Sequence, residues 1–107
     1  MQRVEFNSNN ESFDIITEKK RLFSSQPKIK VENVELKNLK EVDRELYEGQ
    51  FNGMTFFMND NSEILLDENC LGIEDLFRFL CDKAEVYGFK VTKVDVDDDG
   101  IKTTPIK

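Results

Sequence analysis

Carboxylates dominate the side chains of this chain that could do chemistry. The sequence has 22 Asp and Glu against 15 Lys and Arg, and it has no histidine. Histidine is the usual general base near neutral pH and the commonest metal ligand, so zinc chemistry and histidine-dependent nucleophilic catalysis are not expected. Pairs such as Glu41 and Glu45 have the residue types of an acid–base pair, but a chain this acidic forms such pairs by chance. We therefore predict that the protein is not an enzyme.

One motif resembles the start of a calcium-binding loop. Asp95, Asp97, Asp99 and Gly100 spell D-x-D-x-D-G, in which oxygen ligands alternate along the chain before a sharp bend. The twelfth position of such a loop should be a bidentate Glu, but here it is Ile106. The sequence thus favours an acidic hairpin turn and no bound metal or cofactor, with the three aspartates as the alternative calcium site.

The cysteines and the N-terminus bear on location. Cys70 and Cys81 have no metal-binding or redox spacing, and we expect both thiols to be inert and reduced. Residues 1–11 lack the apolar core of a secretory signal, and no apolar run is long enough to span a membrane. These features predict a cytoplasmic protein.

Negative charge is concentrated in the middle of the chain. Residues 41–75 carry ten acidic side chains and one basic one, a net charge of −9, whereas residues 1–40 have a net charge of +2 and residues 76–107 of zero. This distribution argues against direct binding to nucleic acid or to anionic membranes, because both need basic side chains. It favours association with a basic protein, and the alternative is that the acids only keep the domain soluble.

Eight carboxylates of this middle segment are the candidate partner-binding residues. If they gather on one side of the fold, they would imitate the charge of nucleic acid and steer association with a nuclease or another nucleic-acid-binding protein. The candidates are Glu41, Asp43, Glu45, Glu48, Asp60, Glu63, Asp67 and Glu68.

The elements that must position these acids are organised around one predicted helix, residues 73–87. Its apolar residues recur at helical spacing and form one stripe, and Gly72 and Gly88 mark its two ends. Phe79 and Val86 project beside this stripe. They either widen the buried face or form a second interface for a partner or another copy of the chain.

The remaining segments alternate between strand patterns and short helical patterns. Strands are predicted at 3–7, 28–36, 54–58, 63–66, 89–96 and 101–106, with a bulge or turn at Glu32-Asn33 and the last strand confined to a sheet edge by Pro105. Short helices are predicted at 13–23, where Phe13 and Ile15 would also fit a strand, and at 39–47.

The sequence as a whole predicts a single α+β domain over residues 1–107. A mostly antiparallel sheet of about five or six strands would pack against the helix at 73–87, with one or two shorter helices. The favoured function is a non-enzymatic inhibitor that uses an acidic face to block a basic, nucleic-acid-handling protein, as immunity proteins and phage anti-defence proteins do. The alternatives are an oligomeric or scaffold module that uses Phe79 and Val86, and a small hydrolase or calcium-responsive domain.

Overall fold

The computed structural model describes residues 1–20 and 26–107. Within these ranges the chain forms two sheets, one α-helix and one short 3₁₀-helix. In chain order the elements are β1 (Gln2–Phe6), β2 (Ser12–Lys19), β3 (Lys28–Glu35), η1 (Leu36–Asn38), β4 (Leu39–Tyr47), β5 (Gln50–Met58), β6 (Glu63–Asp67), α1 (Ile73–Tyr87), β7 (Lys90–Asp97) and β8 (Gly100–Pro105).

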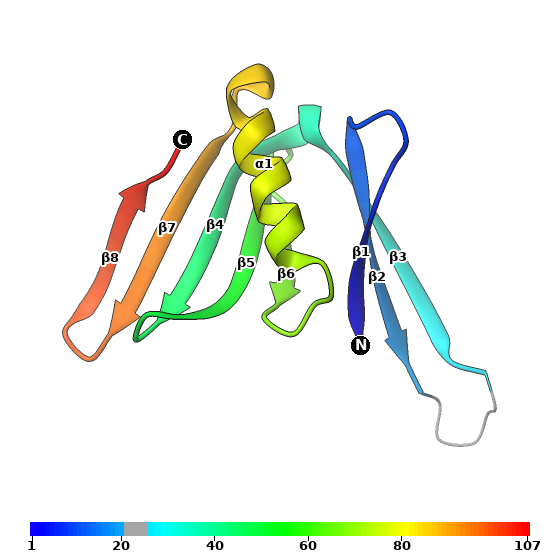
Figure 1. Ribbon diagram of the computed structural model, residues 1–107, viewed down its shortest axis with the longest axis horizontal. Helices are drawn as coiled ribbons and strands as arrows, with labels where there is room; N and C mark the ends of the chain where they lie inside the picture. The colour runs from blue at the N-terminus through cyan, green and yellow to red at the C-terminus, as the bar shows by residue number, and fades with distance from the viewer. Residues whose placement is uncertain (21–25) are drawn as a thin grey trace.

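The two sheets meet around α1. The three-stranded sheet is an antiparallel meander in the order β1-β2-β3, and the five-stranded sheet has the order β6-β5-β4-β7-β8. All neighbouring strands are antiparallel except β4 and β7, which run parallel because α1 carries the chain back between β6 and β7. Figure 1 shows α1 lying across the five-stranded sheet, with the three-stranded sheet on its other side.

One hydrophobic cluster joins the helix to both sheets. Phe13 of β2 contacts Phe56 of β5, with ring centroids 5.5 Å apart, and both side chains are fully buried. Leu76 and Leu80 of α1 belong to the same cluster. A backbone link supports this junction, because Leu71, just before α1, forms a parallel bridge with Arg3 of β1.

The main helix has the predicted bounds, 73–87. Ile73, Leu76, Leu80 and Ala84 are buried, as the helical spacing of apolar residues predicts. The helix ends at Gly88, which adopts a left-handed conformation with φ 77° and donates its N–H to the carbonyl oxygen of Ala84.

Both predicted short helices are wrong. Residues 13–19 of the segment 13–23 belong to strand β2, as the alternation of Phe13 and Ile15 allowed, and residues 21–23 lie outside the described residues. Residues 39–47 form β4. Their helical spacing was misleading because a register shift between Leu39 and Glu41 changes the phase of the strand, and because Arg44 occupies an inward position.

Two further expectations need correction. The predicted bulge at Glu32-Asn33 is absent, since β3 pairs with β2 without interruption from Lys28 to Glu35. Val34 therefore faces the core, while Ile29 and Val31 lie on the opposite, outer face of the same strand. The strands also form two sheets, of three and five strands, and not one sheet of five or six.

The other predicted strands are confirmed within one or two residues, except that β5 begins four residues earlier than predicted. The apolar run 54–58 belongs to β5, which lies inside the five-stranded sheet between β4 and β6. β8 lies at the edge of this sheet, as Pro105 required, because a proline has no N–H to donate to a further strand.

Candidate functional site

The middle strand of the five-stranded sheet presents three carboxylates on the face away from α1. Side chains alternate between the two faces of a strand. Val42 of β4 is fully buried, and the guanidinium of Arg44 lies 4.5 Å from the ring centroid of Phe77 on α1, so these residues face the helix. Glu41, Asp43 and Glu45 therefore project from the opposite face.

Strand register adds two carboxylates from β6 to the same face. Glu41 pairs with Phe57 of β5, which in turn pairs with Glu63. Two rows further along, Glu45 pairs with Gly53, which pairs with Asp67. Residues directly opposite each other lie on the same face of a sheet. We call the surface formed by these five residues the acidic face: Glu41, Asp43, Glu45, Glu63 and Asp67.

The other three predicted acids lie in turns. Glu48 has φ 50° in the turn between β4 and β5, and its N–H donates to the carbonyl oxygen of Val96. The Asp60 carboxylate accepts hydrogen bonds from the N–H and the hydroxyl of Ser62, which lower its pKa. Glu68 is exposed just after β6. Register does not bring these three residues onto the acidic face.

Asp43 has the most perturbed environment of the acidic face. Its Oδ1 atom is buried and finds no hydrogen-bond donor among the described residues. Several causes together raise its pKa to about 7: burial is the largest, followed by a side-chain hydrogen bond with Glu41 and by the negative charges of Glu41 and Glu45. Glu45 has a donor, because the hydroxyl of the buried Thr55 lies 3.0 Å from its Oε1. A cationic donor next to Asp43 would offset both the burial and the repulsion.

Exposed apolar side chains lie on both sides of these carboxylates. On one side, Leu65 shares a row with Asp43 and is 70% exposed. On the other, Tyr47 pairs with Val96, which pairs with Ile101, and Ile101 is 73% exposed. A partner on this face would therefore meet a charged centre with apolar margins.

One positive side chain also lies on this face. Lys90 of β7 pairs with Glu41, so it stands at one end of the carboxylate column. Lys93 lies on the helix-facing side, where its ammonium group is 3.6 Å from Asp95. The lysines of the C-terminal third therefore border the acidic face at one position and do not separate its five carboxylates.

A groove of about 480 Å³ runs between the acidic face and the first two strands. Glu45, Thr55 and Leu65 line one side, and Thr17 and Lys19 of β2 line the other. The remaining lining residues are Met1, Gln2, Asn52, Gly53, Met54, Leu66 and Asp67. The groove places a lysine ammonium and several carboxylates around a shared space, which suits a peptide segment better than a small apolar ligand.

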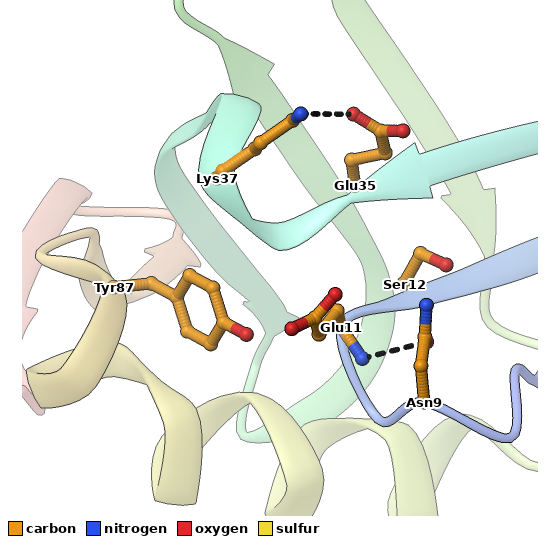
Figure 2. Close-up of a pocket in the computed structure, with 6 residues that line it drawn as sticks. All are labelled: Asn9, Glu11, Ser12, Glu35, Lys37 and Tyr87. Carbon is orange, nitrogen blue, oxygen red and sulfur yellow. Dashed lines mark hydrogen bonds and ion pairs between the residues drawn. The ribbon is translucent and has the colours of Figure 1, made fainter.

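A smaller pocket, of about 170 Å³, lies at the other end of the molecule. Figure 2 shows Tyr87 of α1 pointing toward Glu11, next to Lys37 and Glu35. Asn9 and Ser12 complete the lining. Lys37 is paired with Glu35 at 3.5 Å, and the Glu11 N–H donates to Asn9. Neither of these two contacts is a nucleophile–base pair.

The second predicted interface, Phe79 and Val86, is divided in the structure. The Phe79 ring packs edge-on against Phe6 of β1 with a centroid distance of 5.1 Å, and the Lys83 ammonium lies 5.8 Å from its centroid. Val86 is exposed. The two side chains therefore do not form a continuous apolar strip.

The D-x-D-x-D-G motif forms a hairpin turn between β7 and β8, which is the interpretation that the sequence favoured over a calcium loop. Asp97 accepts the N–H of Asp99, and Asp95 pairs with Lys93 on the strand. Across the described ranges 1–20 and 26–107, no group of three or more Cys, His, Asp or Glu residues is arranged to hold a metal ion. Nor does any helix in those ranges have the length and apolarity needed to cross a membrane.

Both cysteines are free thiols, and their surroundings favour the protonated form. Cys70 is buried, which raises its pKa to about 11, and the Asp67 carboxylate adds to this effect. Burial also raises the pKa of Cys81, which is partly buried. A thiol nucleophile needs the opposite shift, so neither residue is arranged for catalysis.

Sequence reasoning missed the apolar margins of the acidic face. Leu65, Tyr47 and Ile101 were assigned to strands or a helix without a face. The acidic residue at every second position over 41–45 was the available signal that 39–47 is a strand, because a period of two in the sequence is typical of a strand with one solvent-facing side. Comparison of the chain with protein-family models, with curated proteins and with solved structures gives no match.

Proposed function

We propose that this protein is a non-enzymatic inhibitor that acts in the cytoplasm and blocks a basic, nucleic-acid-handling protein through its acidic face. The observation that carries the proposal is the column of Glu41, Asp43 and Glu45 on β4, extended by Glu63 and Asp67 on β6. The partner is a nuclease or another protein whose surface is built to bind phosphates.

The arrangement of charge favours a basic partner over other occupants of this face. Two copies of the chain packed through it would bring like charges together, which is unfavourable. Nucleic acid would be repelled for the same reason, and the net charge of −7 adds to this repulsion. A cationic surface would instead associate rapidly, because opposite potentials steer diffusional encounter.

Asp43 supports a specific role for the face, beyond solubility. A solvating surface would leave each carboxylate hydrated, whereas Asp43 keeps a buried oxygen to which none of the described residues donates. A guanidinium or ammonium group of the partner would supply that donor and shift Asp43 fully to its charged form. Binding should therefore release a proton near neutral pH.

The test is capture of host proteins on the immobilised chain, followed by affinity measurement with the protein that binds. We expect a basic nucleic-acid-binding protein whose affinity falls steeply with added salt. The triple variant Glu41→Lys, Asp43→Lys and Glu45→Lys should lose this binding.

A matched control separates local recognition from bulk charge. Asp82, Glu85 and Asp98 are exposed acids outside the acidic face, and their reversal to Lys makes the same change in net charge. We expect this control to keep most of the affinity. Equal loss in both variants, or a captured partner that is acidic or insensitive to salt, would refute the proposal.

A further inference from the structure

We infer that two copies of this chain pair edge to edge through β3, antiparallel, with Val31 facing Val31 of the second copy and Lys30 facing its Glu32. The two three-stranded sheets would then join into one continuous sheet across a two-fold axis. This inference does not rest on the acidic face, which lies on the other sheet.

β3 offers a long, straight edge. It pairs with β2 on one side, and no other strand of residues 1–20 and 26–107 pairs with its second side. The strand runs from Lys28 to Glu35 without proline or a bulge, so its outward N–H and C=O groups are regularly spaced for a partner strand. Ile29 and Val31 are 55% and 57% exposed on the outer face.

Charge order selects the register. A two-fold axis perpendicular to the sheet keeps each face on its own side, so only registers that match faces are allowed. With Val31 at the axis, Lys30 faces Glu32 of the second copy and Glu32 faces its Lys30. With Glu32 at the axis, Glu32 faces itself, and like charges directly opposite are destabilising. The first register therefore has opposite charges in contact and no like-charge pair.

The side chains are already positioned for this exchange. The Lys30 ammonium lies 3.3 Å from Glu32 within the strand, so both side chains point to the same face. On the other face, the two Val31 side chains would meet at the axis, each next to the buried Ile16 of its own copy, which pairs directly with Val31. Pairing would thus cover apolar surface on one face and form two ion pairs on the other.

The other sheet edges do not have these features. In β6, pairing of the whole strand with itself would place Glu63 against Asp67 of the second copy, which is repulsive. β8 ends at Pro105, which cannot donate to a ladder. The edge of β1 is partly taken by Leu71, whose N–H donates to Gln2 and whose carbonyl oxygen accepts from Val4. β3 is therefore the edge that fits a second copy.

A charge swap tests both the surface and the register. The full chain should show a concentration-dependent dimer in sedimentation equilibrium. Lys30→Glu or Glu32→Lys alone should weaken dimerisation about tenfold or more, because each places like charges opposite each other at two symmetric positions. An equimolar mixture of the two single variants should associate as a heterodimer, and the double variant K30E/E32K should recover the wild-type dimer.

Lys102→Glu on β8 is the matched control. It makes the same change in net charge as K30E at a different edge, and it should leave dimerisation unchanged. Thermal melts of all variants check that the fold is intact. A wild-type chain that stays monomeric throughout the concentration series would overturn the inference. So would a dimer that K30E does not weaken, or single variants that fail to associate with each other.

Discussion

The two faces of the five-stranded sheet differ in the surroundings that they give to a partly buried charged side chain. On the face covered by α1, the Arg44 guanidinium lies between the rings of Phe51 and Phe77 and 3.1 Å from Glu74. On the uncovered face, the neighbouring residue Asp43 has two carboxylates beside it and a buried oxygen that has no donor within residues 1–20 and 26–107. Adjacent residues of one strand thus differ because the helix supplies partners on one side only.

This difference separates stability from recognition within a single strand. The covered face contributes the buried apolar residues and surrounds the Arg44 guanidinium with two rings and a carboxylate, so it should determine the free energy of unfolding. The uncovered face leaves charge uncompensated, which costs stability until a partner compensates it. Substitutions on the two faces should therefore change stability by different amounts and, for charged residues, in different directions.

The largest contrast is expected between two adjacent leucines of β6. Leu66 is 3% exposed in the core, and Leu65 is 70% exposed next to the acidic face. Leu66→Ala should lower the free energy of unfolding by about 2–5 kcal/mol through lost burial and a cavity. Leu65→Ala should change it by less than about 0.5 kcal/mol. Urea denaturation of both variants measures the difference, and equal costs would contradict the assignment of faces.

A smaller effect is expected from glycine substitutions in the β4–β5 hairpin. Gly53 has φ 145°, and a Cβ there would lie 2.8 Å from the backbone oxygen of Leu66. Gly53→Ala should therefore destabilise the fold by about 2 kcal/mol, because the backbone of β5 or β6 must move to make room for the added methyl group.

Gly49 in the same hairpin is the control for this prediction. It has φ 81° with nothing within 4 Å of a Cβ, so Gly49→Ala should cost only about 1 kcal/mol for its positive φ. Thermal melts compare the two variants. If Gly49→Ala were the more damaging, contact with β6 would not be the cause.

Asp43→Asn should stabilise the protein above neutral pH. The folded pKa of about 7 lies above the ordinary aspartate pKa of 3.8, so between about pH 4 and 7 the native state holds a proton that the unfolded chain releases. The contribution of Asp43 to the free energy of unfolding therefore falls as pH rises from about 4 to 7, and it is constant above that range. Removing the carboxylate should gain about 1–2 kcal/mol at pH 8, after allowance for solvent screening.

Unfolding free energies of the wild type and D43N at pH 4, 6 and 8 test this prediction. The difference between the two proteins should grow as pH rises from 4 to 8. Asp98→Asn, in the exposed β7–β8 turn, is the matched control and should show little change over this range. A wild type that gains stability relative to D43N as pH rises would reverse the assigned sign.

The smallest effect is expected for Arg44→Met. Methionine keeps much of the side-chain packing between Phe51 and Phe77 but removes the ion pair with the exposed Glu74. Because the Nε atom of Arg44 is itself buried without a hydrogen-bond partner in the described part of the chain, the loss should be only about 0.5–1 kcal/mol. Arg44→Met should thus slightly lower stability at pH 8, where Asp43→Asn raises it. Changes of the same sign in both would remove the contrast between the faces.

The parts of the fold that were predictable from sequence are those with uninterrupted periodicity. The stripe at Ile73, Leu76, Leu80 and Ala84 repeats over four turns between two glycines, so the helix bounds were recovered. β4 was missed because its inward positions include a cation: a pattern of apolar residues cannot reveal that Arg44 faces the core. Its phase is also shifted by the irregular pairing near Leu39.

The sequence predicted which segment carries the acidic residues of the candidate site, but it did not predict which of them share a surface. Net charge located the acids within 41–75, yet the side on which each one lies depends on strand register. Treating 39–47 as a helix placed Glu41 and Glu45 next to each other on one side, whereas the strand brings Asp43 between them. The division of the strands between two sheets depends on long-range contacts such as that of Phe13 with Phe56, which local pattern does not encode.

The parallel pairing of β4 with β7 has a consequence for how the chain assembles. β5 and β6 follow β4 through tight turns, so these three strands can pair through contacts between residues that are close in the sequence. β7 can pair with β4 only when the two ends of the long segment that contains β5, β6 and α1 come together. Forming contacts between residues so distant in the sequence is slow. We expect amide protons of β5 to become protected early in refolding and those of β7 and β8 late, which pulsed hydrogen exchange would measure; simultaneous protection would argue for a single concerted step.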